Sequence, residues 1–389
     1  MKQFKDFFRT IFLVFTGIIL VCPTTFADEN DRLDSIEIGL ITCSPHEELY
    51  SLYGHSAIRI HDLNTGEDLV FNYGVFNFKQ PFFILRFVLG IPKYELGIIP
   101  YDYFCKYYKD WGSQVTEQVL NITNVEKQRI AQELAFNYRP ENRMYVYNVF
   151  YDNCSTRPRN IIEQCLQGRI EYTYNNNYTP SFREMTREYT RNHPWATFGN
   201  DILLGVKADL ETDARQQEFL PFNLRNDFDH AMINRNGVLT PLVKERRELV
   251  APGVQIIEED FPLSPTMCAL LLLGLSLIAF GIEYYKKTTY VWIDALLMTL
   301  TGIAGCLLTV MLFSQHPTTS TNLQVLILNP VALAFIPKIV KKKKSYWFRI
   351  NALLIFIFFI GGIWQDYAEG MEIVALCLLL RILRHYNDK

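Results

Sequence analysis

Apolar and polar positions follow a short alternation in the first part of the chain. Residues 56–60 alternate roughly, residues 62–67 (Asp-Leu-Asn-Thr-Gly-Glu) have the composition of a turn, and residues 69–73 return with apolar and aromatic side chains. A period of two predicts strands, and two such runs around a polar turn predict a β-hairpin. Residues 36–104 as a whole are therefore expected to be mostly strands.

Two later segments have the spacing of helices. Residues 124–137 show it with Thr123 or Asn124 as the expected N-cap. Residues 153–166 show it through apolar positions on one face, namely Ile161, Ile162, Cys165 and Leu166. Residues 201–240 are polar and predict no particular element. Strands followed by separate helices indicate an α+β domain.

The C-terminal part is a series of five apolar stretches, at residues 265–283, 291–313, 323–338, 346–364 and 370–385. A bilayer helix needs about 20 residues, so most stretches are long enough, while the third and fifth are short. Asn329-Pro330 in the third stretch is expected to kink it or to supply a helix–helix hydrogen bond. The pattern predicts an all-α membrane bundle of about five helices.

Charges between these stretches predict their orientation. Lysine and arginine lie at every second connection, at Lys286-Lys287, at Lys338 with Lys341–Lys344, and at Arg381 with Arg384. The other two connections, 314–322 and 365–370, contain neither residue. By the positive-inside rule the basic ends are cytoplasmic, so the chain enters the first helix from outside.

The N-terminus has the pattern of a secretory signal peptide. Lys2, Lys5 and Arg9 precede an apolar run at 11–21, and Thr24–Ala27 offers a small-residue cleavage site. An uncleaved anchor is the alternative, but the run is short for a span. We therefore expect a signal peptide at 1–27, an exported catalytic domain at 28–262 and a transmembrane domain at 263–389.

Composition agrees with this division. Residues 28–262 hold 24 Lys and Arg and 34 Asp and Glu, a net charge of −10, whereas residues 263–389 hold 11 and 6, a net charge of +5. The first part has the composition of an acidic soluble domain and the second that of a bundle in lipid. The overall net charge of −3 argues against a nucleic-acid-binding protein.

Two segments carry candidate catalytic residues. In residues 53–59 (Tyr-Gly-His-Ser-Ala-Ile-Arg), His55 starts a predicted strand, and in residues 151–157 (Tyr-Asp-Asn-Cys-Ser-Thr-Arg), Cys154 opens a predicted helix. The positive end of a helix dipole favours a thiolate, and a nearby imidazole would stabilise it and pass a proton. Asn72, on the next strand, is a candidate third member that orients the ring. Backbone N–H groups of Cys154 and Ser155 are candidates for an oxyanion hole.

Other interpretations remain open on these residues alone. Four cysteines of the exported domain, Cys43, Cys105, Cys154 and Cys165, are compatible with two disulfides. His55 is equally compatible with an ordinary half-buried strand histidine. A metal site is conceivable from His46, Glu47, His55 and His61, although their spacing matches no established ligand pattern.

Several spaced motifs resemble one known family. They are Thr42–Pro45 followed by Glu48–Ser51, then GHSAIRI at 54–60, FNYGVFNF at 71–78, PENR at 140–143, YDNCSTRPR at 151–159 and Ser314–Pro317. In this order they resemble the Lnb-type bacterial lipoprotein N-acyltransferases, closely over residues 35–165 and more loosely in the tail.

The resemblance implies a fold and a reaction. The fold would be permuted papain-like, similar to lecithin:retinol acyltransferase, with His55 as the permuted histidine and Cys154 as the nucleophile. The activity would be N-acylation of the diacylglyceryl-cysteine of lipoproteins, with phospholipid as acyl donor, at the periplasmic face of the bacterial inner membrane. No cofactor or metal is expected.

Further residues are candidates for substrate binding: Arg59, Tyr73, Asn153, Arg157 and His316. Arginines bind phosphate by bidentate contacts, but in an acidic domain they also pair with carboxylates. His316 lies in a loop predicted on the catalytic side, where it would contact lipid headgroups or only solvent.

Two other functions compete with acyl transfer. A cysteine peptidase or amidase acting on cell-wall peptide would use the same pair, with its mouth open to the periplasm. A non-enzymatic envelope scaffold would have Cys154 in a disulfide and His55 too far away for a hydrogen bond.

Overall fold

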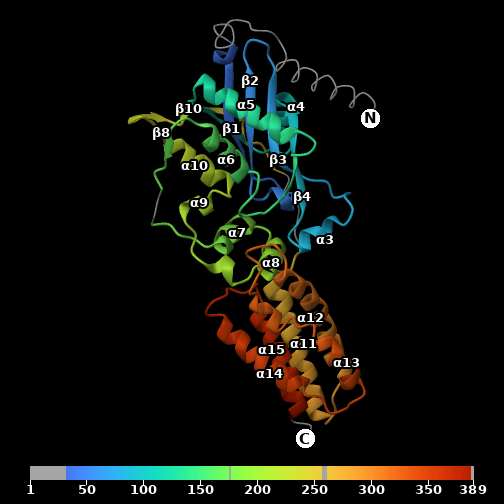
Figure 1. The fold of residues 1–389 in the computed structure, drawn as a ribbon. Coiled ribbons are helices and arrows are strands. Elements are labelled where there is room, and N and C mark those ends of the chain that lie inside the picture. The colour runs from blue at the N-terminus through green and yellow to red at the C-terminus, as the bar shows by residue number, and fades with distance from the viewer. Residues whose placement is uncertain (1–31, 175–176, 256–260, 387–389) are drawn as a thin grey trace.

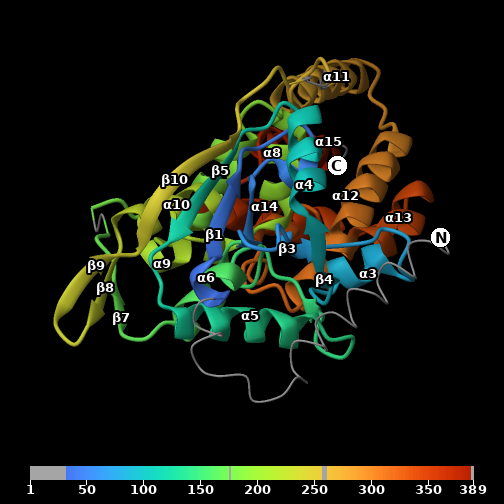
Figure 2. The ribbon, with the colours of Figure 1, turned by 90° about the horizontal axis from the view of Figure 1, so that it is seen from above.

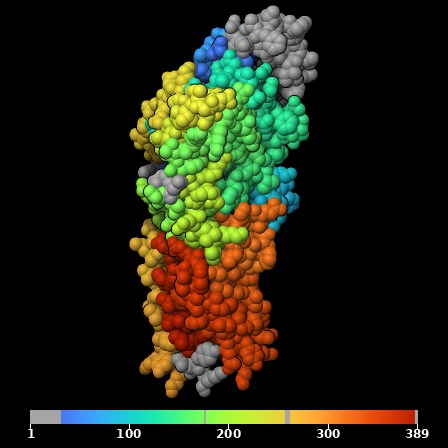
Figure 3. Space-filling model, turned by 60° about the vertical axis from the view of Figure 1, so that its left-hand side comes forward, coloured from blue at the N-terminus to red at the C-terminus, as the bar shows by residue number. Residues whose placement is uncertain are grey.

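The computed structural model describes residues 32–174, 177–255 and 261–386, and the expected signal peptide lies outside them. Within these residues the chain forms an N-terminal α+β domain on one end of a helical bundle, as Figure 1 and the space-filling view in Figure 3 show. The α+β class expected from the sequence is confirmed.

The centre of the N-terminal domain is a seven-stranded antiparallel sheet in the order β10-β5-β1-β2-β3-β4-β6. Its strands are β1 (Ile36–Cys43), β2 (His55–Asp62), β3 (Asp68–Val75), β4 (Lys93–Pro100), β5 (Val115–Leu120), β6 (Met144–Val146) and β10 (Val243–Val250). A smaller sheet joins β7 (Arg169–Glu171), β8 (Met232–Arg235) and β9 (Val238–Pro241). The predicted hairpin is confirmed as β2 and β3.

Helices cover both faces of the large sheet. On one side, α5 (Asn124–Tyr138), α6 (Thr156–Cys165) and α10 (Pro221–His230) share an apolar core with the sheet. On the other side lies α4 (Tyr101–Asp110), which packs on β1, β5 and β10. The predicted cap of α5 is confirmed, because Thr123 accepts from the Glu126 backbone N–H while the Glu126 carboxylate accepts from that of Thr123.

The remaining short elements lie toward the bundle. They are η1 (Leu49–Ser51), α3 (Phe83–Val88), α7 (Phe182–Thr190), α8 (Pro194–Leu203), η2 (Val206–Asp209) and α9 (Ala214–Gln217). Strand β1 runs down toward the bundle, η1 turns the chain, β2 runs away again and β3 returns (Figure 1). The first residue of β2 and the last residues of β3 therefore lie at the sheet end nearest the bundle.

The bundle contains α11 (Pro265–Tyr285), α12 (Val291–Leu312), η3 (Leu323–Leu326), α13 (Ala332–Val340), α14 (Trp347–Gly361) and α15 (Met371–Tyr386). Helices α11 and α12 are long and apolar enough to cross a membrane, with a mean hydropathy of 2.1 in each. Four of the five apolar stretches are single helices close to the predicted bounds.

The prediction for the third stretch needs a correction, because the helix there is broken rather than kinked. It forms the 3₁₀ turn η3 and the short helix α13, separated at Asn329-Pro330. Pro330 cannot donate to a continuing helix, and the Asn329 side chain accepts from the Val331 backbone N–H, which starts the next helix instead. Gly305 on α12 lets this break approach closely, since a Cβ there would lie 2.3 Å from the carbonyl oxygen of Leu328.

Buried polar side chains join the N-terminal domain to the bundle. The side chain of Gln324 donates to the carbonyl of Asp201 at 2.9 Å, that of Asn322 to the carbonyl of Ile202 at 2.8 Å, and that of Gln365 to the carbonyl of Leu204 at 3.0 Å. All three carbonyls lie at the end of α8, where helical carbonyls lack partners within the helix. These bonds fix how the domain sits on the bundle.

Candidate active site

His55 and Asn72 meet where two neighbouring strands separate. The ladder between β2 and β3 ends at the pair Ile58 and Phe71, and β3 has an irregularity between Asn72 and Val75. Beyond the ladder, His55 Nε2 lies 3.1 Å from Asn72 Oδ1, which accepts its hydrogen bond. Bulges of this kind often re-aim side chains next to active sites.

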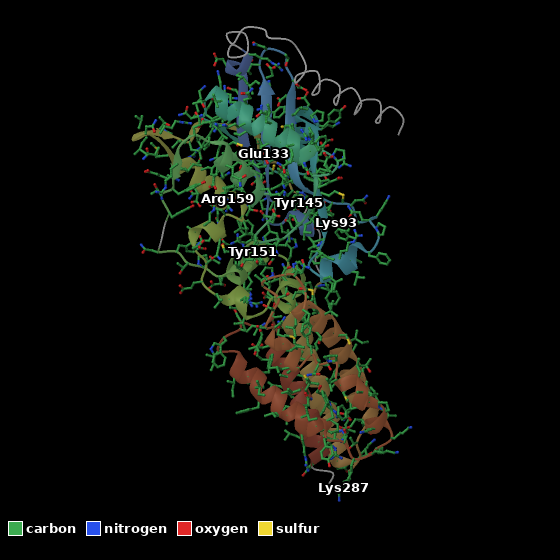
Figure 4. All side chains as sticks on the ribbon, viewed as in Figure 1. Lys93, Glu133, Tyr145, Tyr151, Arg159 and Lys287 are labelled. Atoms are coloured by element: carbon green, nitrogen blue, oxygen red, sulfur yellow. The ribbon has the colours of Figure 1, made fainter. Side chains whose placement is uncertain are left out.

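Cys154 reaches the same place from the loop before α6. The chain descends from Tyr145 to Tyr151, turns, and climbs through α6 toward Arg159 (Figure 4). Cys154 lies at this turn, two residues before α6, and is partly exposed.

Asn153 holds the turn in shape. Its Oδ1 accepts from the backbone N–H groups of Ser155 and Thr156, both at 2.9 Å, and its Nδ2 donates to the carbonyls of Val149 and Phe219, both at 2.8 Å. The side chain therefore caps the helix and anchors it to two other segments.

The thiol of Cys154 hydrogen-bonds the imidazole of His55. Because His55 Nε2 donates to Asn72, Nδ1 is the nitrogen left for the thiol. Burial raises the pKa of Cys154. The charge of His55, its hydrogen bond and the backbone N–H groups of Ser56 and Cys154 lower this pKa by more, so it falls below its usual 9.0. For His55, burial lowers the pKa, but Cys154 and the hydrogen bond to Asn72 outweigh burial and raise it above 6.5.

These opposite shifts favour a thiolate–imidazolium pair. Each partner stabilises the charged form of the other, as in papain-like enzymes where a cysteine is activated by a histidine. The structure thus brings together the three predicted catalytic residues, and their roles remain a prediction.

The predicted oxyanion hole needs a correction. The N–H of Ser155 is occupied by Asn153, so it does not face the reaction centre. The backbone donors at the sulfur are those of Cys154 and Ser56, and Ser56 was not predicted. Ser56 also joins the strand to the helix, because its Oγ lies 3.0 Å from the Oγ of Ser155 in a buried contact.

Sequence reasoning missed Gly74 and considered His46 only as a metal ligand. His46 stacks on Trp111 at 3.6 Å between ring centroids, and burial, together with the His55 charge, lowers its pKa to about 4. Gly74 adopts a φ of +92°, and a Cβ there would lie 3.6 Å from Cys154 Cβ. Glycine is thus the residue that keeps space beside the thiol, and its position in the FNYG run was the available signal.

The two candidate arginines form ion pairs with carboxylates of the domain. Buried Arg59 contacts Asp68 at 2.5 Å and Glu117 at 2.8 Å. Arg157 binds Asp152 at 2.6 Å and its guanidinium lies 3.5 Å from the ring centroid of Tyr145. Of the two alternatives open for these arginines, the structure has the carboxylate pairs.

The other substrate-binding candidates have different surroundings. Tyr73 is 1% exposed in the core beneath α5 and α6, and Asn153 is the helix cap described above. His316 lies away from the thiol, where its Nε2 donates to the carbonyl of Phe87 at 2.7 Å. His316 therefore ties the loop after α12 to α3.

The disulfide and metal alternatives also have clear outcomes. Cys43, Cys105, Cys154 and Cys165 are all free thiols. Among the residues with described coordinates, no three His, Cys, Asp or Glu side chains gather to hold a metal ion. His61 lies at the opposite end of β2 from His55, so the four side chains considered for a metal do not converge.

Two family models match separate parts of the chain. The Lnb N-terminal periplasmic domain matches residues 24–189, and the Lnb transmembrane domain matches residues 256–389. The chain belongs to the Lnb family. No curated protein and no solved structure matches it.

Membership of the Lnb family indicates which part of the chain is periplasmic and which is in the membrane. The α+β domain is the periplasmic domain and the bundle is the transmembrane domain of a membrane-associated protein. The His55–Cys154 site lies in the matched periplasmic part, at the sheet end nearest the transmembrane bundle (Figure 1).

Proposed function

We propose that this Lnb family member is an acyltransferase that moves an acyl chain from a phospholipid to the N-terminal amine of the diacylglyceryl-cysteine of lipoproteins. The observation that carries the proposal is the free Cys154 thiol, hydrogen-bonded to His55 at the end of the periplasmic domain nearest the transmembrane bundle.

In the first half-reaction, the Cys154 thiolate attacks the carbonyl carbon of a phospholipid ester. The tetrahedral oxyanion accepts hydrogen bonds from the backbone N–H groups of Cys154 and Ser56. As the bond between carbon and glycerol oxygen breaks, the His55 imidazolium donates its proton to that oxygen. The products are a thioester on Cys154 and a lysophospholipid.

In the second half-reaction, the neutral amine of the acceptor attacks the thioester. Neutral His55 accepts the amine proton, the carbon–sulfur bond breaks, and the thiolate–imidazolium pair is restored. An amine is a stronger nucleophile toward a thioester than water is. Exclusion of water near the bilayer further protects the intermediate.

The position of the site favours lipid over the competing substrates. A peptidase or amidase of the cell wall needs a mouth open to the periplasm, whereas this thiol lies at the end of the sheet next to the bundle. A scaffold with bridged cysteines is inconsistent with the free thiol and the His55 hydrogen bond.

The test is acyl transfer by the full-length protein in phospholipid vesicles. Purified diacylated lipopeptide is added, and mass spectrometry looks for one extra acyl group on its N-terminal amine. We expect transfer with the wild type and with Cys105→Ala, which removes another free thiol of the same domain, and none with Cys154→Ala. Transfer by Cys154→Ala would overturn the mechanism. Lysophospholipid without acylated peptide would indicate a phospholipase.

A further inference from the structure

Helix α3 and the residues before it expose large apolar side chains. Phe82 is 73% exposed and Ile84 77%, and Phe78, Leu85 and Leu89 are also exposed. No residue of α3 is buried. In water such a contiguous apolar patch is unfavourable and marks a binding surface.

This segment lies at the end of the transmembrane bundle. Figure 1 shows α3 below the sheet, next to the end of α12 that faces the N-terminal domain, Figure 2 shows both on the same side of the molecule, and the two helices are in contact. The backbone N–H of Gln315 donates to the carbonyl of Leu89 at 2.9 Å, and His316 donates to that of Phe87. Gly90 allows this contact, since a Cβ there would lie 2.6 Å from the His316 backbone nitrogen. The apolar side chains are thus held beside the end of α12, one of the two helices long and apolar enough to cross a membrane.

Charge and backbone shape agree with a membrane surface. Lys79 and Arg86 lie within the same segment, and no carboxylate pairs with either among the residues described here. Cations beside apolar side chains are typical of helices that lie in a lipid interface. Phe82 holds a φ of +58°, a strained conformation for a bulky residue, while its side chain is exposed.

A strip of aromatic rings connects this segment to the catalytic thiol. Phe78 contacts Phe83, Phe83 and Phe76 stack with Tyr94, and Tyr94 stacks on Tyr147 with 4.2 Å between ring centroids. Tyr147 lies across Gly74 from Cys154, since a Cβ on Gly74 would be within 3.7 Å of both side chains. The strip is a continuous series of ring contacts from the exposed segment to the nucleophile, in which Phe78 is exposed, Phe76, Phe83 and Tyr147 are half-buried, and Tyr94 is buried.

We propose that residues 78–89 insert among the phospholipids of the periplasmic leaflet, and that the strip formed by Phe76, Phe78, Phe83, Tyr94 and Tyr147 guides an acyl chain from the bilayer to Cys154. The second part rests on the proposed acyltransferase function, and the first part does not. The occupant is a phospholipid acyl chain, because the strip is apolar, begins beside the bundle and has the cations Lys79 and Arg86 next to its start.

Insertion is tested by fluorescence in the full-length protein. Ile84→Trp is reconstituted in vesicles of phospholipid with brominated acyl chains, and Leu63→Trp serves as the matched control. Leu63 is also an exposed apolar residue, but it lies in the turn at the other end of the sheet. Relative to the wild type, we expect the added fluorescence of Ile84→Trp to be quenched and that of Leu63→Trp not to be. Equal, weak quenching of both would overturn insertion.

Guidance of the chain is tested by comparing two acyl donors. Ile84→Glu and Phe83→Ala should lower transfer from vesicle phospholipid at least about tenfold, because each removes apolar contact with the acyl chain or its leaflet. Acylation of Cys154 by water-soluble p-nitrophenyl acetate should change less than about twofold, as should both reactions in Leu63→Glu. Phe83→Leu should retain most of the lipid reaction because it keeps the apolar volume.

The outcomes separate the two proposals. Equal losses with both donors in a folded Phe83→Ala protein, or full lipid activity in Ile84→Glu, would overturn the guiding role. If the wild type acylates no lipopeptide but still forms the acyl-enzyme from vesicle lipid in an Ile84-dependent way, the acceptor in the proposed function is wrong and the guiding role stands. If Cys154 takes no acyl group from lipid at all, both the function and the guiding role fail, whereas quenching alone decides insertion.

Discussion

His55 donates to Asn72 at 3.1 Å at a point where their strands no longer pair with each other. A continuing ladder would have fixed both backbones but left no opening for a third group. Because the strands separate, the loop before α6 can bring Cys154 to the other nitrogen of the ring. The hydrogen bond to Asn72 then sets which nitrogen carries the proton.

Asn72→Ala is expected to lower acyl transfer by about tenfold to a hundredfold, less than the whole contribution of an acid–base group. The hydrogen bond to Asn72 favours imidazolium, so its loss lowers the pKa of His55. The alkaline limb that reports this group should therefore move to lower pH. The pH profile of kcat/KM measures this shift of the alkaline limb. Asn64→Ala, in the β2–β3 turn, is the control. An unchanged profile would contradict the orienting role.

His55→Ala is expected to slow alkylation of Cys154 at neutral pH. In the wild type the pKa of Cys154 lies below 9.0, because His55 and two backbone donors outweigh burial. Without the imidazole, burial acts against fewer opposing contacts, so thiolate forms only at higher pH. The rate of reaction with iodoacetamide against pH, followed at Cys154 by peptide mass spectrometry, should shift upward. A superimposable curve would show that the two side chains are not coupled.

Gly74→Ala tests the space beside the thiol, and Gly66→Ala is its matched control. Both glycines have positive φ, +92° and +74°, but only Gly74 faces Cys154, while Gly66 has nothing within 4 Å of a built Cβ. Each substitution should cost about 1–2 kcal/mol of folding free energy from the left-handed backbone. Transfer should fall about tenfold or more in Gly74→Ala alone, since it displaces the acyl group from the thiol. Equal activity of the two variants would show that this space is not used.

Local patterns in the sequence predicted the elements whose stability is itself local. The β2–β3 hairpin follows from alternation around a polar turn, and α5 follows from helical spacing behind an N-cap at Thr123. The catalytic pair could also be predicted from local sequence. Cys154 opens a predicted helix, which favours a thiolate, and His55 starts a predicted strand as the candidate base.

What the sequence could not predict depends on contacts between distant residues. The third apolar stretch breaks at Asn329-Pro330, and at its start Asn322 and Gln324 bind carbonyls of α8, contacts that no count of apolar residues registers. Residues 201–240 form several short elements that contacts with distant residues hold in place, as buried Arg183 does for Asp209 at 2.7 Å. The free thiol of Cys154 likewise depends on tertiary geometry, because an exported cysteine is by default a disulfide partner.

Asn153→Ala is expected to destabilise the periplasmic domain. It leaves the N–H groups of Ser155 and Thr156 and two carbonyls without their partner, at a cost of about 2–4 kcal/mol for the cap and the buried groups together. Asn153→Asp should recover part of this loss, because its carboxylate still caps the helix. Thermal unfolding followed by circular dichroism measures both. If the alanine variant unfolds at the wild-type temperature, the cap is not what shapes the Cys154 loop.

Arg381→Met is expected to destabilise the bundle strongly. The guanidinium contacts Glu283 at 2.5 Å and Asp294 at 2.8 Å, and all three side chains are buried where α11, α12 and α15 meet. Removing the arginine leaves two buried carboxylates close together, with His385 at 2.9 Å from Asp294 as the basic side chain that remains, and breaking a buried pair costs about 3–5 kcal/mol. Arg381→Lys should not fully replace it, because an ammonium lacks the planar fork that reaches both carboxylates.

Arg349→Met, at an exposed position on α14, is the control and should unfold like the wild type. Thermal unfolding in detergent compares the four proteins. If Arg381→Met and Arg349→Met unfold at the same temperature, this cluster does not hold the three helices together.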